Sequence, residues 1–150
     1  MGEEAIYSFL LLHYADSCSF ITGAVYEYVN RPESQSHKKI MDPWGDVASA
    51  LKQKILSIGL YEKYANTLNA FFATAAIVSL DKIASINKLS AFKEQGKEYI
   101  KRWKGRMDSE YPIDIGHMPS KAKAMYPFLK VNWITPIYVA SRLRKKLYRN

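Results

Sequence analysis

The stretch DPWGDVASALKQKILSIG, from Asp42 to Gly59, has the features of one complete helix and sets the pattern for most of the chain. Asp42 is a favoured N-terminal cap, and Pro43 suits the first helical position, where its missing N–H would have no partner. Gly59 is the residue type that most often ends a helix in a left-handed conformation. The apolar residues between these ends recur at helical spacing, and they are Val47, Leu51, Ile55 and Ile58. This stretch therefore predicts an amphipathic helix.

The same helical rhythm continues towards the C-terminus. Apolar stripes at helical spacing run from Tyr61 to Val78 and from Leu89 to Met107. Prolines interrupt residues 112–127, which leaves room for a loop and one short helix at 120–125. A last helix is predicted over 134–148. Together these segments predict a bundle of about five helices.

The first 41 residues have a different pattern. Residues 3–16 predict a helix that is apolar over much of its circumference, and residues 19–29 predict a strand that ends in Val-Tyr-Glu-Tyr-Val. A single strand needs a neighbour to satisfy its backbone groups. The predicted fold class is therefore mainly α, with one or two N-terminal strands left over from an α/β sheet. Two parts are expected, a sheet remnant over 1–41 and a helical region over 42–150.

Several short motifs follow one another in the N-terminal part. Gly2-Glu3-Glu4 comes first, Tyr7 follows in the first helix, and the predicted strand ends in Tyr26-Glu27-Tyr28. The polar loop Arg31-Pro32-Glu33-Ser34-Gln35-Ser36 comes next. This order resembles the C-terminal part of the catalytic domain in bacterial family 2 (GT-A type) nucleotide-sugar glycosyltransferases.

The resemblance implies a chemistry for these residues. Glu4, with Glu3 beside it, would be the general base that deprotonates the acceptor hydroxyl, although the family usually has Asp at that position. Arginine, hydroxyl and imidazole groups are good donors to phosphate oxygens, and the diphosphate-binding residues implied are Arg31, Ser34, Ser36 and His37. The activity implied is transfer of a sugar from a nucleotide-diphosphate donor to a polysaccharide or lipid-linked acceptor.

The chain also departs from that family. It has no Asp-x-Asp metal motif and no Gly-rich phosphate loop. The resemblance therefore implies that a nucleotide-binding domain is missing N-terminal to the motif, and that this chain alone is an inactive C-terminal fragment. The divalent metal (Mg or Mn) and the nucleotide sugar would belong to the intact enzyme, with no metal or cofactor in this chain. The competing interpretation is that Glu3 and Glu4 are ordinary acids in a first helical turn, followed by an ordinary polar loop.

The net charge of +8 is concentrated in one region. Residues 101–150 hold 12 Lys and Arg against 3 Asp and Glu, a net charge of +9. In the last predicted helix, Ala140, Leu143 and Leu147 share one side. The basic residues on other sides are candidates for contact with an anionic surface, and they are Arg142, Arg144, Lys145, Lys146 and Arg149.

This charge suggests a second function, that of a non-enzymatic basic helical module. A solvated helix face is its simplest explanation, peripheral attachment to an anionic membrane is the second, and binding to nucleic acid ranks last because no recognition motif accompanies the charge. The sequence shows no signal peptide, and the longest apolar run, residues 70–80, is far shorter than the roughly 20 residues of a membrane span. We therefore expect a cytoplasmic protein, and peripheral attachment to the inner face of the plasma membrane is an open alternative. An exposed apolar first helix could also pair two copies as a homodimer.

The cysteine and histidine residues indicate neither an internal disulfide nor a zinc site. Cys18 is the only cysteine, so the chain cannot form an internal disulfide. It shows no metal-ligand spacing with the three histidines, which argues against a zinc site.

Overall fold

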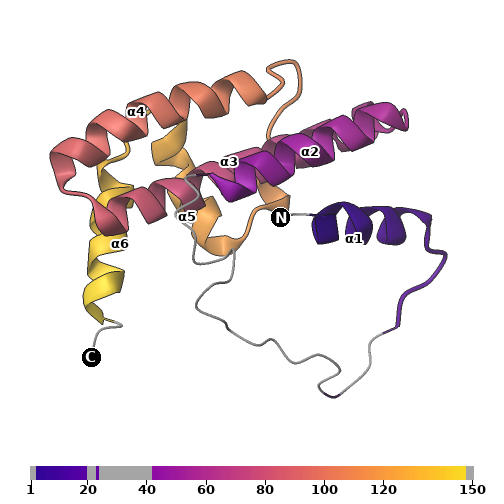
Figure 1. The fold of residues 1–150 in the computed structure, drawn as a ribbon, viewed down its shortest axis with the longest axis horizontal. Helices are drawn as coiled ribbons and strands as arrows, with labels where there is room; N and C mark the ends of the chain where they lie inside the picture. The colour runs from indigo at the N-terminus through magenta and orange to yellow at the C-terminus, as the bar shows by residue number, and fades with distance from the viewer. Residues whose placement is uncertain (1–2, 20–22, 24–41, 148–150) are drawn as a thin grey trace.

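The computed structural model describes residues 3–19, 23 and 42–147. Within these residues the chain is helical (Figure 1), and the prediction of a mainly α fold is confirmed. The elements are α1 (Glu3–Tyr14), α2 (Pro43–Ser57), α3 (Tyr61–Ile86), α4 (Leu89–Arg106), the short 3-10 helix η2 (Ile115–His117), α5 (Ser120–Lys130) and α6 (Thr135–Leu147). The predicted strand over 19–29 lies almost entirely outside the described residues and stays a prediction.

Helix α3 is the central element, and α2, α4, α5 and α6 all pack against it (Figure 1). It is rich in buried alanine, which lets neighbouring helices approach closely. By length and composition alone, α3 could cross a membrane, which the short uninterrupted apolar run had not indicated. Most of its apolar window is buried inside the fold, however, and a helix covered on several sides is expected to be apolar all round.

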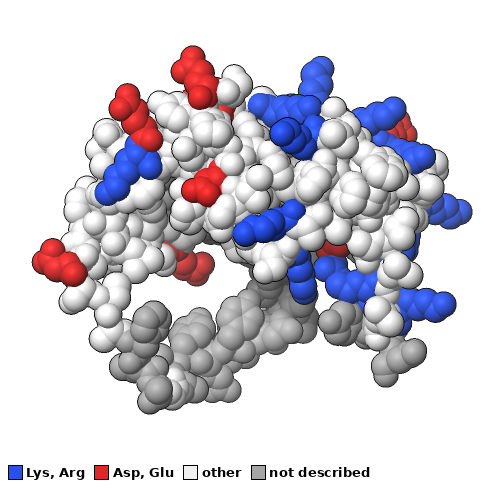
Figure 2. All heavy atoms as spheres, turned by 180° about the vertical axis from the view of Figure 1, so that it is seen from behind, with Lys and Arg blue, Asp and Glu red and all other residues white. Residues whose placement is uncertain are grey.

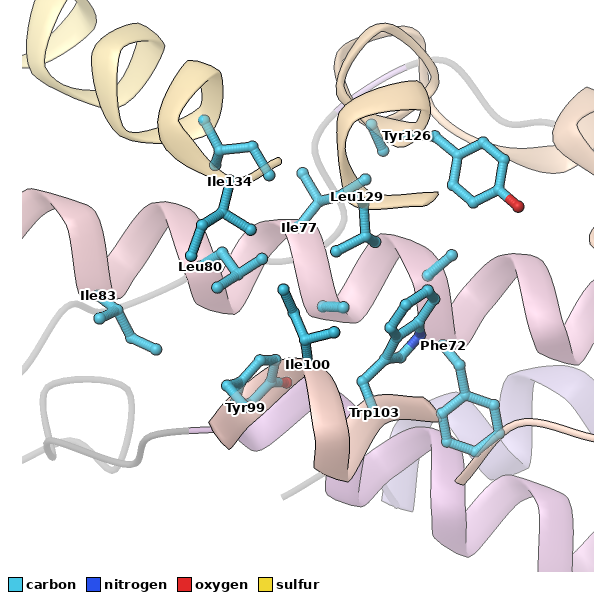
Figure 3. Packing of buried hydrophobic residues seen from close by; sticks show 14 of the residues in the cluster. Phe72, Ile77, Leu80, Ile83, Tyr99, Ile100, Trp103, Tyr126, Leu129 and Ile134 are labelled. Carbon is cyan, nitrogen blue, oxygen red and sulfur yellow. The ribbon is translucent and has the colours of Figure 1, made fainter. Parts of the chain in front are cut away.

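The main core fills the space between α3 and its neighbours (Figure 3). Phe72 and Leu80 of α3 face Tyr99 and Trp103 of α4, and Leu129 closes the core from α5. All five side chains are buried. The stripe predicted on α4 marks its core-facing side. The stripe predicted on α3 is turned away from this core, because Leu68 and Phe71 join a second, smaller cluster with α2 and Val78 is 43% exposed.

Gly96 in α4 has a packing role that its low helix propensity does not suggest. A Cβ atom at this position would lie 2.5 Å from Cδ1 of Ile134 and 3.4 Å from Leu80. The glycine therefore lets Ile134, at the start of the α6 segment, pack directly on the α4 backbone.

Both predicted ends of α2 are confirmed, whereas α5 is longer than predicted. The Asp42 carboxylate accepts a hydrogen bond from Gly45 N (2.9 Å), and Gly59 has a φ angle of 71°, as the helix stop requires. Helix α5, however, continues beyond the predicted 120–125 to Lys130, with Pro127 inside it. Pro127 is exposed and removes only one backbone hydrogen bond, while burial of Tyr126 and Leu129 stabilises the last turn.

Helix α1 rests on the rest of the fold by one side only. Ile6 and Phe9 pack against a small second cluster formed by α2 and α3, and His13 Nδ1 lies 2.7 Å from the Tyr64 hydroxyl. The opposite side of α1 is apolar and exposed, as the sequence suggested, and its large residues are Tyr7, Leu11, Leu12 and Tyr14.

Candidate functional site

The residues implied by the glycosyltransferase resemblance fall mostly outside the described part of the chain. Glu3 is the first residue of α1, and the Glu4 side chain is exposed in the first turn of the same helix. The loop residues Arg31, Ser34, Ser36 and His37 lie outside the described residues. A shared site for Glu4 and this loop therefore stays a prediction.

The basic residues of α6 are largely engaged with the carboxyl end of α3. The Arg142 guanidinium donates to the carbonyls of Ser85 (3.4 Å) and Asn87. Lys145 Nζ also donates to the Ser85 carbonyl (2.9 Å). Cations are favoured at a helix C-terminus, where the last carbonyls lack helical partners and the helix dipole is negative.

The other three cations predicted on α6 have different environments. Arg144 pairs with Asp81 of α3, Lys146 is exposed, and Arg149 lies outside the described residues. The structure thus places Arg142, Arg144 and Lys145 in contacts that hold α6 on α3. As a group they are less available to an external anion than the sequence implied.

A second basic surface lies on α4 and was not singled out from the sequence. Its residues are exposed and follow one another at intervals of four, four and three along one side of the helix. They are Lys93, Lys97, Lys101 and Lys104, and we call them the lysine ridge. None of the four forms an ion pair with any residue that the structure describes. The ridge is therefore available to an external anionic partner.

The distribution of charge over the molecule agrees with this placement. Figure 2 shows Lys and Arg gathered over the top and right-hand side of one face, whereas Asp and Glu lie mostly towards the left. Helices α4 and α6 contact each other and both rest on α3. The two basic helices are therefore neighbours in the fold.

A buried polar network joins α2, α3 and α4. Asp42, only 5% exposed, accepts hydrogen bonds from Gly45 N (2.9 Å) and from the Ser79 hydroxyl (3.2 Å). Its other carboxylate oxygen lies 2.5 Å from Nη1 of Arg106, whose Nη2 reaches Asp46 (2.8 Å). The donors satisfy the hydrogen-bonding capacity of this buried carboxylate, so the network has the properties of a structural clamp between the three helices.

Two tyrosines, Tyr61 and Tyr99, have hydroxyl pKa values above the ordinary value. Burial, aided by the hydrogen bond that Tyr61 donates to Asp108 (2.9 Å), raises the pKa of the Tyr61 hydroxyl to about 12. Burial and a hydrogen bond to Asp42 raise the pKa of Tyr99 well above its ordinary value. The same Tyr61 bond, with a backbone N–H from Glu110, lowers the pKa of Asp108. These shifts result from burial and from hydrogen bonds, and none of them gives a group that titrates near neutral pH.

The raised tyrosine pKa values predict a specific loss of stability in alkali. The unfolded chain loses these phenolic protons near pH 10, whereas the folded chain keeps them to about pH 12 at Tyr61. The free energy of unfolding should therefore fall as pH rises from 10 to 12. In Tyr61→Phe this fall should be shallower than in the unmodified protein, as measured by urea unfolding at several pH values. Tyr7→Phe, at an exposed tyrosine, is the control, and an unchanged slope in Tyr61→Phe would contradict the assignment.

The described residues also form an open pocket of about 360 Å³ where α1, α2 and α3 meet η2. Its lining is mainly apolar and includes Phe9, Ile55, Leu68 and Phe71, together with His117. His117 Nδ1 lies 2.7 Å from Asp114 Oδ2, and this contact lowers the pKa of Asp114. Phe9, Leu68 and Phe71 belong to the small cluster by which α1 packs on the fold, so the pocket is explained by that packing.

The resemblance assigns its divalent metal to the intact enzyme and not to this chain, and that assignment stays a prediction. Among the described residues, no group of three His, Cys, Asp or Glu side chains is close enough to hold a metal ion. The lysine ridge is thus the group of described side chains best suited to bind a partner. Comparison of the chain with protein-family models, curated proteins and solved structures gave no match.

Proposed function

We propose that this chain is a helical module that binds an anionic membrane surface peripherally, through the lysine ridge of α4. The observation that carries the proposal is the alignment of four exposed lysines on one helix face with no ion-pair partner among the described residues. The net charge of +9 on residues 101–150 places further cations nearby.

The ridge has dimensions suited to a surface rather than to one small anion. Lys93 and Lys104 are 11 residues apart, which corresponds to roughly 16 Å along a helix. Each lysine next to an anionic leaflet is worth about 1 kcal/mol of binding free energy. Arg106, at the end of the same helix, is not available in this way because Asp42 and Asp46 already bind it.

Exposed apolar residues beside the ridge favour lipid over nucleic acid. Leu89 precedes Lys93 by one helical turn on the same side of α4, and it is exposed together with Ile86 at the end of α3. Lipid headgroups with acyl chains below them can contact both cations and apolar side chains, whereas a phosphate backbone offers little to isolated aliphatic groups.

The test is binding of the purified chain to vesicles of phosphatidylcholine with and without 30% phosphatidylserine, followed by co-sedimentation over a range of salt. We expect binding only to the anionic vesicles, with an affinity that falls steeply as salt rises. Equal binding to both vesicle types, or none to either, would overturn the proposal. Tighter binding to duplex DNA or RNA than to the anionic vesicles would instead identify nucleic acid as the partner.

A second candidate is the one implied by the resemblance, the C-terminal segment of a nucleotide-sugar glycosyltransferase with Glu4 as general base. It is supported by the exposed apolar outer side of α1, which leaves a surface that a further domain could cover. Titration with UDP or GDP tests it, because the loop with Arg31 and His37 should contribute to diphosphate binding. Binding weakened by Arg31→Ala would support this candidate, and binding that this substitution leaves unchanged would count against it. Sugar transfer by this chain alone is not expected.

A further inference from the structure

Helix α6 is attached to the fold by a side on which apolar, polar and basic residues meet. Ile137 and Ser141 are each 2% exposed, and the Ser141 hydroxyl donates to the Asp81 carbonyl (3.1 Å). The Arg142 guanidinium lies over the Tyr138 ring at 5.2 Å and reaches the last carbonyls of α3. These contacts fix the rotation of α6 about its own axis.

This rotation leaves an apolar stripe on the outside of α6. Val139, Leu143 and Leu147 are 49%, 58% and 76% exposed. They are spaced four residues apart, so they lie nearly in line along the helix. A helix on a protein surface normally buries its apolar side and exposes its charges. Helix α6 departs from this pattern, because its apolar stripe faces outward while Arg142, Arg144 and Lys145 contact the last part of α3.

We propose that the outward stripe of α6 inserts into an anionic lipid bilayer and anchors the molecule that the lysine ridge attracts. This inference rests on the proposed function, since the ridge supplies the long-range attraction. Charge complementarity favours the bilayer as the occupant, because Lys146 is exposed beside the stripe and the surrounding third of the chain is strongly basic. Interfacial helices of this kind place their apolar side about 5–10 Å into the headgroup and acyl boundary while neighbouring cations contact the headgroups.

The depth of α6 in the bilayer is the direct measurement. In a Cys18→Ser background, Leu143→Cys and Gln53→Cys each provide one exposed site for an environment-sensitive fluorophore. With vesicles containing 30% phosphatidylserine, the label at 143 should shift to shorter wavelength and be quenched by lipids that carry a quencher in the acyl chain. The label at 53, on α2, should do neither. A label at 143 that stays in water on protein-loaded vesicles would overturn the insertion.

A pair of variants separates this inference from the proposed function. The variant Leu143→Gln/Leu147→Gln changes two exposed leucines. Because glutamine is also a good helix former, the fold should be kept. The affinity of this variant for the anionic vesicles should fall at least tenfold, while the remaining binding should keep its dependence on salt. Unchanged affinity would refute insertion and leave the ridge-based function standing, whereas absence of salt-dependent vesicle binding by the unmodified chain would refute the function itself.

A second copy of the chain is the other possible cover for the stripe. If light scattering shows a dimer in the absence of lipid that the Leu143→Gln/Leu147→Gln variant dissociates, the stripe is a subunit interface and the insertion is overturned. A monomer at the concentrations used for vesicle binding is the expected result.

Discussion

Replacement of Arg106 by methionine is expected to lower the free energy of unfolding by about 3 kcal/mol, the lower end of the range for breaking a buried ion pair. Methionine keeps most of the aliphatic volume, so the loss comes from the charge and its hydrogen bonds. Asp42 would remain as a carboxylate that is 5% exposed, with only neutral donors from Gly45, Ser79 and Tyr99. The lower end applies because Arg106 itself is 24% exposed.

Asp46 provides a matched control on the same guanidinium. Its side chain is 67% exposed, and exposed ion pairs contribute at most about 1 kcal/mol. Asp46→Asn should therefore cost much less than Arg106→Met in urea unfolding followed by circular dichroism. The double variant Asp42→Asn/Arg106→Met should recover part of the loss, because asparagine still caps α2 and no buried charge is left unpaired. Equal costs for Asp46→Asn and Arg106→Met would show that the buried pair is not what stabilises this junction.

The second large effect is expected on membrane binding. Replacing all four ridge lysines, Lys93, Lys97, Lys101 and Lys104, with glutamine should weaken binding to anionic vesicles by roughly 10³-fold, because about 1 kcal/mol is lost for each lysine. Stability should change little, since the four side chains are exposed and glutamine is a good helix former. The dependence of binding on salt should become shallower in the same variant, because fewer cations meet the surface.

Two double variants test whether the position of the lysines, and not only the net charge, determines vesicle binding. Lys93→Gln/Lys97→Gln removes two charges from the ridge, and Lys54→Gln/Lys63→Gln removes two from exposed positions on α2 and at the start of α3. The first pair should lose roughly 30-fold in vesicle affinity, measured by co-sedimentation, and the second pair much less. Equal losses would mean that net charge alone governs binding and that the ridge has no special role.

The helical fold was largely predictable because it depends on local patterns. The cap at Asp42, the stop at Gly59 and the apolar stripes each act over a few residues and mark the helices well. The clamp between Asp42 and Arg106 joins residues 64 apart in the sequence, and no local pattern pairs them. The close approach allowed by Gly96 is equally invisible, because it depends on Ile134 from another segment.

The proposed binding surface was harder to predict, for two physical reasons. The basic excess was assigned to residues 101–150, and this boundary separates Lys93 and Lys97 from Lys101 and Lys104. The alignment of the four lysines on one side of a helix was therefore not apparent. In α6, the amphipathic pattern identified two sides correctly but could not show which of them faces inward. In the fold, α6 contacts α3 through buried Ile137 and through Arg142 and Lys145, which donate to the last carbonyls of α3.

The one-sided attachment of α1 has a consequence for how the protein opens. Ile6 and Phe9 join only the small cluster with α2 and α3, while the main core is built from other elements. Opening free energies within one fold vary with the apolar contacts that each segment makes. Helix α1 should therefore behave as a separate cooperative unit that detaches while α2 to α6 stay folded, so its amide hydrogens should exchange with solvent long before those of α3.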